Sequence, residues 1–340
     1  MIPGLCVEEA IFLSAADQQK VFAGCTAAGA QYVRIGVPWS VINPVRGTYN
    51  WGILDAAITT AHDNHLKVLL NVIPPKPSFG FWIFGGTSRS DLATFCAALC
   101  TRYYPQGVAD YEIWNEMNSA ASWSTGGLLW LPGSVNVANY VSWLQPTYKA
   151  MHQAVPGVNV ISGGLEACAS WLNELQDPVT ALSSMYKAGL KGNCDAVAYH
   201  PYSLSSGFTY EPPTATQQFV ADLTALHDIM VANGDGDKII WATEWGFPTI
   251  IGSTRNSAGS IQATITGDQQ AQYLTEQWQV MSTLDFIGPA LIYQYRDYSL
   301  PNQTYSHADP DQNHGLVTSN YAPKPALSAV TALFTPKPAA

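Results

Sequence analysis

The sequence predicts an α/β protein whose eight parallel strands and eight helices close into one (β/α)₈ TIM barrel. Short apolar or β-branched runs alternate along the chain with segments of helical periodicity, which is typical of βα units. Eight such units close into a barrel more readily than they form an open sheet. The chain of 340 residues contains no low-complexity linker, so we expect a single domain over residues 1–340, with a frayed Pro- and Ala-rich tail at 335–340.

Each expected strand is a short run dominated by apolar or β-branched residues. In the third run Val68, Leu69 and Leu70 are consecutive, as expected for a strand that is covered on both faces. The expected strands are residues 4–7, 32–37, 67–73, 110–116, 159–163, 196–202, 238–244 and 290–295.

Between these strands, apolar residues recur at helical spacing. The expected helices are residues 15–28, 51–65, 90–103, 137–154, 178–188, 214–233, 268–284 and 324–334. Long segments that contain Gly and Trp follow the third, fourth and seventh strands, at residues 74–89, 118–133 and 247–267. Loops that follow the strands of a barrel form its C-terminal face, where active sites are found.

The composition limits the classes of function. Apolar residues make up 47% of the chain and charged residues 12%, which supplies a large core and argues against disorder. The net charge of −10 argues against nucleic acid or an anionic membrane as a partner. No apolar run reaches the roughly 18 residues that a transmembrane helix needs, so we expect no membrane insertion. The 11 Trp and 17 Tyr could stack on sugar rings, although packing inside the fold accounts for more than about half of them.

The six cysteines and the N-terminus bear on the compartment. Cys168 and Cys194 flank one expected helix and either pair or remain buried thiols, whereas Cys96 and Cys100 lie near the upper Cα separation for a bridge. No signal peptide precedes the first expected strand. We expect an extracellular or envelope-directed protein, which reaches that location through a removed leader or by release on lysis, as in phage systems.

Polar side chains gather where the expected strands end. A strand that is apolar for several residues and then carries a polar group departs from its burial pattern, as functional sites do. These residues are Arg34, Asn71, Asn115, Glu116, His200, Tyr202, Glu244, Tyr293 and Tyr295.

Two glutamates from different strand ends can together cleave a glycosidic bond. Glu116 and Glu244 would act as a protonated acid and an ionised carboxylate. Carboxyl groups about 5–5.5 Å apart predict retention of the anomeric configuration, and about 6.5–9.5 Å predicts inversion. The sequence leaves this separation open, and the alternative is a glutamate that only forms an ion pair with Arg34.

Several motifs occur in one order along the chain. They are residues 33–35 (VRI) with Trp39, 47–51 (GTYNW), 111–118 (YEIWNEMN), 195–202 (DAVAYHPY), 241–246 (WATEWG), 315–317 (GLV) and 323–326 (PKPA). Together they resemble glycoside hydrolase clan A, the cellulase superfamily, and most closely its families 39 and 5. The resemblance spans nearly the whole chain and implies a retaining O-glycosidase without a cofactor or a metal.

The resemblance also implies the roles of single residues. It makes Glu116 the acid/base and Glu244 the nucleophile, and it places Asn115 on the sugar 2-hydroxyl. It implies that Tyr202 donates a hydrogen bond to Glu244 and that Arg34 lies near the same carboxylate.

Four further residues complete the expected binding site. His200 would orient a carboxylate or the substrate, and Asn71 stands where family 5 enzymes carry a His. Trp245 is a candidate for sugar stacking. Tyr295 would replace the Trp that many relatives carry at the end of the eighth strand.

The remaining candidates are interpreted more plainly. We interpret Glu112 as a buried structural acid paired with a cation of the barrel. Glu8, Glu9 and Glu166 lie near strand ends, where loop capping is favoured over substrate contact. The stacking pool outside the strands is Trp82, Trp123, Trp130 and Trp171.

Two other classes of function fit the sequence less well. A carbohydrate-binding barrel without catalysis does not need two carboxylates that repel each other. A metal-dependent hydrolase or an aldolase needs a ligand cluster or a strand-end Lys, and neither is apparent. We therefore expect hydrolysis of a polysaccharide or an oligosaccharide, endo-acting in preference to exo-acting. The oligomeric state stays open, with a monomer favoured.

Overall fold

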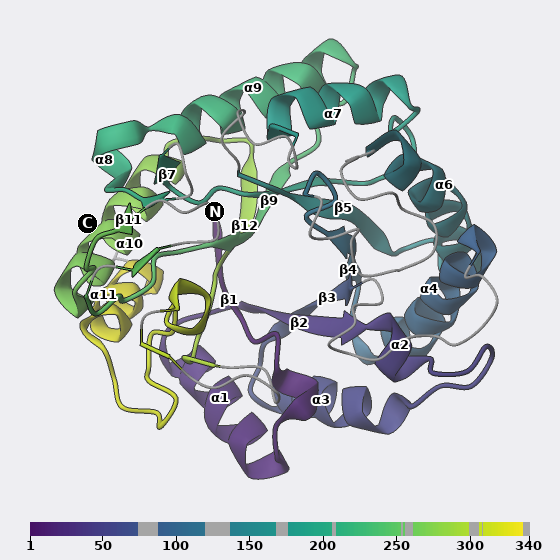
Figure 1. Ribbon diagram of the computed structural model, residues 1–340. Helices are drawn as coiled ribbons and strands as arrows, with labels where there is room; N and C mark the ends of the chain where they lie inside the picture. The colour runs from purple at the N-terminus through teal and green to yellow at the C-terminus, as the bar shows by residue number, and fades with distance from the viewer. Residues whose placement is uncertain are drawn as a thin grey trace, which may run out of the picture.

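A computed structural model describes residues 1–73, 88–119, 137–167, 176–205, 209–252, 254–255, 261–298, 306–307 and 309–335. Eight parallel strands follow one another around a closed barrel in chain order, and helices form the outer ring (Figure 1). This confirms the predicted (β/α)₈ barrel. Its strands are β1 (Ile2–Cys6), β2 (Tyr32–Pro38), β3 (Lys67–Ile73), β4 (Asp110–Asn115), β5 (Asn159–Glu166), β6 (Val197–His200), β9 (Ile240–Trp245) and β12 (Ile287–Ile292).

Helices lie close to the predicted segments. They are α1 (Ala15–Ala27), α3 (Trp51–Asp63), α4 (Arg89–Tyr103), α6 (Val137–Ala154), α7 (Pro178–Lys187), α8 (Pro213–Thr216), α9 (Gln218–Ala232), α10 (Gly267–Met281) and α11 (Pro325–Phe334). The expected helix 214–233 is divided into α8 and α9 because Gln217 adopts a left-handed conformation, with φ of 43°, between them.

Short elements complete the described fold. They are α2 (Trp39–Ile42), the 3₁₀ helices η1 (Ala10–Phe12), η3 (Tyr104–Gln106) and η4 (Pro310–Gln312), and the two-residue strands β7 (Leu204–Ser205), β8 (Thr209–Tyr210), β10 (Thr254–Arg255) and β11 (Ile261–Gln262). Strands β7 and β8 form one antiparallel pair, and β10 and β11 form another.

The first and last strands begin earlier than predicted. Pro3 lies in β1 and Pro289 in β12, and these strands pair in parallel with Ile2 opposite Pro289. Proline usually marks the end of a strand pattern, so the prediction started both strands after it. In the structure both prolines lie near the beginning of their strands.

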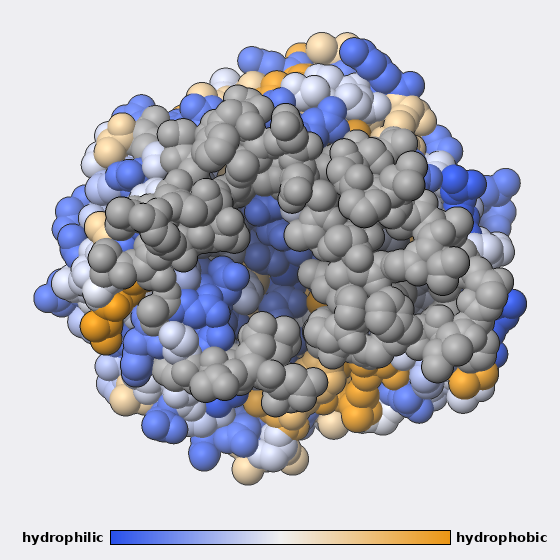
Figure 2. Space-filling view, viewed as in Figure 1, coloured by the Kyte–Doolittle hydropathy of each residue, from blue (hydrophilic) through white to orange (hydrophobic). Residues whose placement is uncertain are grey.

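The barrel interior has an apolar floor beneath a polar layer. An apolar cluster of barrel residues includes Tyr32, Leu69 and Trp241. Two residues further along the same strands come Arg34, Asn71 and Thr243, which therefore face the same side. Viewed in the direction of Figure 1, a hollow opens over the barrel, and the atoms visible on its floor are hydrophilic (Figure 2).

The cysteines that the structure describes are buried free thiols: Cys6, Cys25, Cys96, Cys100 and Cys194. Cys96 and Cys100 are therefore not bridged. Cys168 lies outside the described residues. Of the helices that the structure describes, none combines the length and the hydropathy that crossing a membrane requires.

Candidate active site

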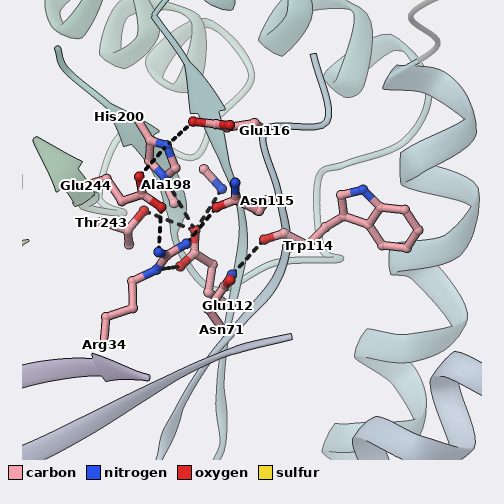
Figure 3. Close-up of polar contacts among 12 residues, drawn as sticks. Arg34, Asn71, Glu112, Trp114, Asn115, Glu116, Ala198, His200, Thr243 and Glu244 are labelled. Carbon is pink, nitrogen blue, oxygen red and sulfur yellow. Dashed lines mark hydrogen bonds and ion pairs between the residues drawn. The ribbon is translucent and has the colours of Figure 1, made fainter. Parts of the chain in front are cut away.

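Arg34 lies at the centre of the polar layer and is 1% exposed. Its Nε donates to Glu112 Oε2 at 2.6 Å, and its Nη2 donates to Asn115 Oδ1 at 2.8 Å. Its Nη1 lies 2.6 Å from both Glu8 Oε1 and Glu244 Oε1. One guanidinium therefore joins the ends of four barrel strands (Figure 3).

Glu244 is the last residue but one of β9, and its side chain is 10% exposed. Besides the bond from Arg34, it accepts a hydrogen bond from the Tyr202 hydroxyl at 3.0 Å. His200 Nδ1 lies 3.7 Å from the same carboxylate. The structure thus brings Arg34 and Tyr202 to Glu244 as the resemblance implies, and both fix the direction of its oxygens.

Glu116 follows β4, and its side chain is 24% exposed. The backbone is left-handed on both sides of Asn115, with φ of 84° at Trp114 and 48° at Glu116. Such conformations cost energy for residues other than glycine and are concentrated at active sites. The Trp114 ring points away from the cluster and packs on α6, where the Tyr140 ring lies 6.4 Å away (Figure 3). This strained turn presents Asn115 and Glu116 to the barrel interior.

Glu116 and Glu244 approach each other closely. One carboxylate oxygen of each, together with a ring nitrogen of His200, lies within 4.8 Å of the others. This is close to the separation of about 5–5.5 Å at which a carboxylate can attack the sugar directly, and it is shorter than the gap an inverting enzyme needs for water.

His200 lies between three carboxylates. Its Nδ1 is 3.0 Å from Glu116 Oε1, and its Nε2 is 3.9 Å from Glu112 Oε1. Burial opposes a charged imidazole, but the charge of Glu244 and the contacts with Glu112 and Glu116 raise the pKa of His200 to about 10. His200 is therefore a cation at neutral pH. With Glu116 and Glu244 it could in principle hold a metal ion, but a protonated imidazole has no free ring lone pair, which favours hydrogen bonding over coordination.

Glu112 is fully buried inside the barrel. Its Oε1 accepts hydrogen bonds from the Gly164 amide at 2.9 Å and from Thr243 Oγ1 at 3.0 Å. Burial alone would raise its pKa, but Arg34 and His200 together outweigh burial and lower it. The prediction of a buried acid paired with a barrel cation is confirmed.

Asn71 of β3 stands in register with Glu112 of β4, and it is also fully buried. Its Nδ2 donates to the Trp114 carbonyl at 2.8 Å, which holds the left-handed turn before Glu116. The structure therefore places Asn71 behind the site as a support for the acid.

Two predicted binding residues do not join the cluster. Trp245 follows Glu244 and so faces the opposite side of β9, where it stacks on Trp278 of α10 with ring centroids 6.1 Å apart. The Tyr295 hydroxyl packs against Gly24 of α1. The contact is so close that a Cβ added at Gly24 would lie 1.8 Å from the hydroxyl oxygen. Both residues pack between the barrel and its helices, so the structure does not support a substrate contact for either.

Tyr293 takes the place expected for Tyr295. Strand β12 ends three residues earlier than expected, at Ile292, so Tyr293 is the first residue beyond it. The Tyr293 ring lies 5.3 Å from that of His314, and burial and then the charge of Glu244 raise its pKa well above the usual value.

A wall of aromatic side chains continues from Tyr293. His314 Nε2 lies 3.0 Å from the Tyr210 hydroxyl, and the Tyr210 ring lies 6.2 Å from that of Tyr202. Burial and then the charge of Lys324 lower the pKa of His314 to about 3, so this histidine is neutral. The sequence analysis missed Tyr210 and His314; the only signal was that His314 directly precedes the motif at 315–317.

Glu8 and Glu9 have separate roles. Glu8 binds Arg34, whereas Glu9 is buried with Oε1 3.7 Å from Arg296 Nε. Burial raises the pKa of Glu8 to about 7, against the lowering effect of Arg34. Of the other stacking candidates, Trp82, Trp123, Trp130 and Trp171 lie outside the described residues.

Gly164 leaves room for His200. A Cβ added there would lie 2.1 Å from His200 Nε2, so Gly164→Ala should displace a buried ring. We expect a loss of about 1–3 kcal/mol in the free energy of unfolding, as for other overpacked cores. Urea denaturation measures it. Gly52→Ala is the matched control, because nothing lies within 4 Å of its added Cβ; equal effects of the two changes would contradict the close approach.

The family Glyco_hydro_42, described as Beta-galactosidase, matches residues 14–84. No curated protein sequence is significantly similar to the chain.

Solved structures share the whole barrel. A family 39 glycoside hydrolase from the gut symbiont Bacteroides cellulosilyticus WH2 is 20% identical with a TM-score of 0.71, over 97% of this chain and 62% of that one. A GH5_18 variant from Bifidobacterium longum, in complex with Manb1-4GlcNAc, is 13% identical with a TM-score of 0.73, over 98% and 78%. The exo-beta-1,4-mannosidase Op5Man5 from Opitutaceae bacterium strain TAV5 is 15% identical with a TM-score of 0.65, over 98% and 59%.

The first two neighbours belong to families 39 and 5, which the motifs resemble, and this confirms the resemblance at the level of the fold. The chain spans about 60% of the length of two of them.

Proposed function

We propose that this chain is a retaining glycoside hydrolase in which Glu116 is the acid/base and Glu244 the nucleophile. The observation that carries the proposal is the approach of these two carboxylates to within 4.8 Å at the mouth of the barrel. Their surroundings differ: Arg34 and Tyr202 bind Glu244 and favour an ionised nucleophile, whereas His200 binds Glu116.

The first step forms a covalent intermediate. Glu116 gives its proton to the glycosidic oxygen while a Glu244 oxygen attacks the anomeric carbon, and the bond from that carbon to the leaving sugar breaks. Asn115, which Arg34 holds at 2.8 Å, is placed to bind the 2-hydroxyl as charge develops on the ring. In the second step Glu116 takes a proton from water, whose oxygen displaces Glu244 from the same carbon.

The stereochemical outcome tests this mechanism. Each of the two displacements inverts the anomeric carbon, so the first product should carry the substrate's configuration. Proton NMR of the anomeric signal, recorded in the first minutes on a panel of polysaccharides and aryl glycosides, measures it. An inverted first product would exclude Glu244 as the nucleophile while leaving a glycosidase with a different mechanism.

We propose a neutral polysaccharide or oligosaccharide as the substrate. Arg34 already has four acceptors, Lys324 is bound to Asp297 at 2.7 Å and His200 lies 3.0 Å from Glu116, so each of these cations already has a carboxylate partner within the protein. The charges of Glu116 and Glu244 also reach Asp311, whose pKa burial, Asp309 and these charges raise to about 6. This excess of carboxylates favours uncharged sugars.

We propose that the enzyme cleaves bonds inside the polymer chain. We also propose that it acts outside the cell that makes it. The abundance of Trp supports an extended groove, although the Trp-rich segments lie outside the described residues. One similar structure is named an exo-beta-1,4-mannosidase, so the exo mode is the alternative. A ladder of oligosaccharides early in digestion supports endo action, and a single monosaccharide supports exo action.

A further inference from the structure

Glu166 is a carboxyl group that the proposed mechanism does not use. It is the last residue of β5, and it stands in register with His200, the last residue of β6. Residues paired across neighbouring strands present their side chains to the same face of the sheet. The side chain of Glu166 is therefore on the face of His200, which binds the acid/base.

A bulge in β5 produces this orientation. Ile161 pairs with Ala196 and Leu165 with Tyr199, so four steps along β5 match three along β6. The extra residue falls in the stretch that contains Gly164, and a bulge of this kind reverses the alternation of side chains beyond it. Before the bulge Ile161 faces the barrel interior, whereas beyond it Leu165 packs outward and the next residue faces the active site.

The turn that carries Glu116 also forms hydrogen bonds with Glu166. The Ser119 amide donates to the Glu116 carbonyl at 2.9 Å and closes the turn. Between them Asn118 is fully buried: its Nδ2 donates to the Glu166 carbonyl at 2.9 Å, and its Oδ1 accepts from the Glu166 amide at 2.8 Å. The Ser119 hydroxyl bonds to the Glu166 carboxylate itself. Any displacement of one glutamate is thus transmitted to the other.

Charged groups on three elements act on the Glu166 carboxyl. Burial and then the negative charge of Glu116 raise the pKa of Glu166 to about 8, while the Ser119 hydroxyl and His200 oppose the rise. Asp311 on η4 adds a smaller increase. Because like charges act on each other, an ionised Glu166 must in turn favour the protonated form of Glu116.

We propose that Glu166 is a positioning residue that shares a proton with Glu116 and so keeps the acid/base in its protonated form at neutral pH. The idea rests on the proposed function, because only a general acid needs that proton at the start of the reaction. It also resolves a conflict in the site, since the His200 cation on its own would favour ionised Glu116. When the shared proton lies on Glu116, the ionised Glu166 supplies the opposing charge.

The sign of the effect follows from the coupling. In Glu166→Gln the neighbour is always neutral, so Glu116 loses its proton at a lower pH than in the parent. The alkaline limb of the kcat/KM profile should move down by about one pH unit, equivalent to tenfold at a fixed pH on that limb. Glu166→Asp, which retains the charge, should restore part of the shift. Glu276→Gln, a matched change on the outer helix α10, should leave the limb in place.

The leaving group separates proton supply from general damage. A dinitrophenyl glycoside departs without help from an acid, so Glu166→Gln should leave its kcat/KM unchanged on the alkaline limb. A loss of the same size with this substrate and with an ordinary oligosaccharide would overturn the proposal.

Carboxyl titration by ¹³C NMR tests the coupling without any turnover. With ¹³C-labelled glutamate, the parent should show one glutamate that titrates above neutral pH. Glu116→Gln should move that titration to lower pH, although burial keeps it above the ordinary range. A titration that does not move in Glu116→Gln would refute proton sharing, even if the variants at position 166 fail to fold. If the coupling is present and the parent cleaves no glycoside, the proposed function fails and the shared proton stands.

Discussion

Replacing Glu244 with Gln should reduce turnover by about four orders of magnitude or more, the largest effect expected for any single change in this protein. The amide has nearly the shape of the carboxylate, so the Gln side chain occupies nearly the same position beside Arg34 and Tyr202. It cannot, however, form the glycosyl intermediate. The free energy of unfolding should change little by comparison. Initial rates on an aryl glycoside, with a urea melt beside them, separate the two effects.

Azide gives the decisive control for that residue. In Glu244→Ala a cavity replaces the carboxylate, and azide can enter it, attack the anomeric carbon and displace an activated leaving group. One displacement occurs where two occurred before, so the glycosyl azide should carry the inverted configuration. In Glu116→Ala azide should instead act in the second step and yield the retained configuration. Exchanged configurations would mean that the two roles are reversed.

Replacing Arg34 with Met should lower the free energy of unfolding by about 3–5 kcal/mol, the cost of leaving buried charges without their partner. Glu112, Glu8 and Glu244 would lose the one cation that all three share. Arg34→Lys should give an intermediate loss, because a single ammonium group cannot bind all of these acceptors with the geometry of a guanidinium. Urea unfolding of the three proteins measures the series.

The loss caused by Arg34→Met should depend on pH. In the parent, Arg34 holds the pKa of Glu112 below its ordinary value despite burial, so this group adds stability above that value and loses it as pH falls. In the variant only His200 still opposes burial, so the pKa of Glu112 rises and this group adds less stability than in the parent as pH rises. The gap between parent and variant should therefore widen from pH 4 to pH 7. A difference in unfolding free energy that does not change with pH would show that the other carboxylates compensate for the lost cation by binding protons.

The sequence is most informative where one physical requirement shapes a whole segment. Burial on both faces makes the strands apolar runs, so the βα units could be predicted with small errors at their ends. Glu116 and Glu244 were candidates because carboxylates at strand ends depart from the burial pattern, and the resemblance of the motifs around them to clan A supplied their roles. The burial of Glu112 beside a cation of the barrel followed from simple alternation along β4, and the structure identifies that cation as Arg34.

The prediction failed where a position depends on exact strand register. Trp245 and Tyr295 are aromatic residues beside a site, and only the register of β9 and β12 shows that both face the helices. The bulge near Gly164 has no periodic signal, because it breaks the alternation from which a strand is recognised. Glu166 therefore looked like a loop cap although it stands beside the acid. A His or Tyr that reaches the site from a late loop, such as His314, carries no local pattern at all.

The single guanidinium at the centre of the barrel has a consequence for how the chain acquires its structure. Arg34 and Glu244 are separated by 210 positions, so their contact closes a very long loop and forms only after most of the chain has been brought together. During synthesis Arg34 leaves the ribosome early. Its last acceptor, Glu244, becomes available only after the seventh barrel strand has been synthesised. Completion of the active site and completion of folding are thus one late event.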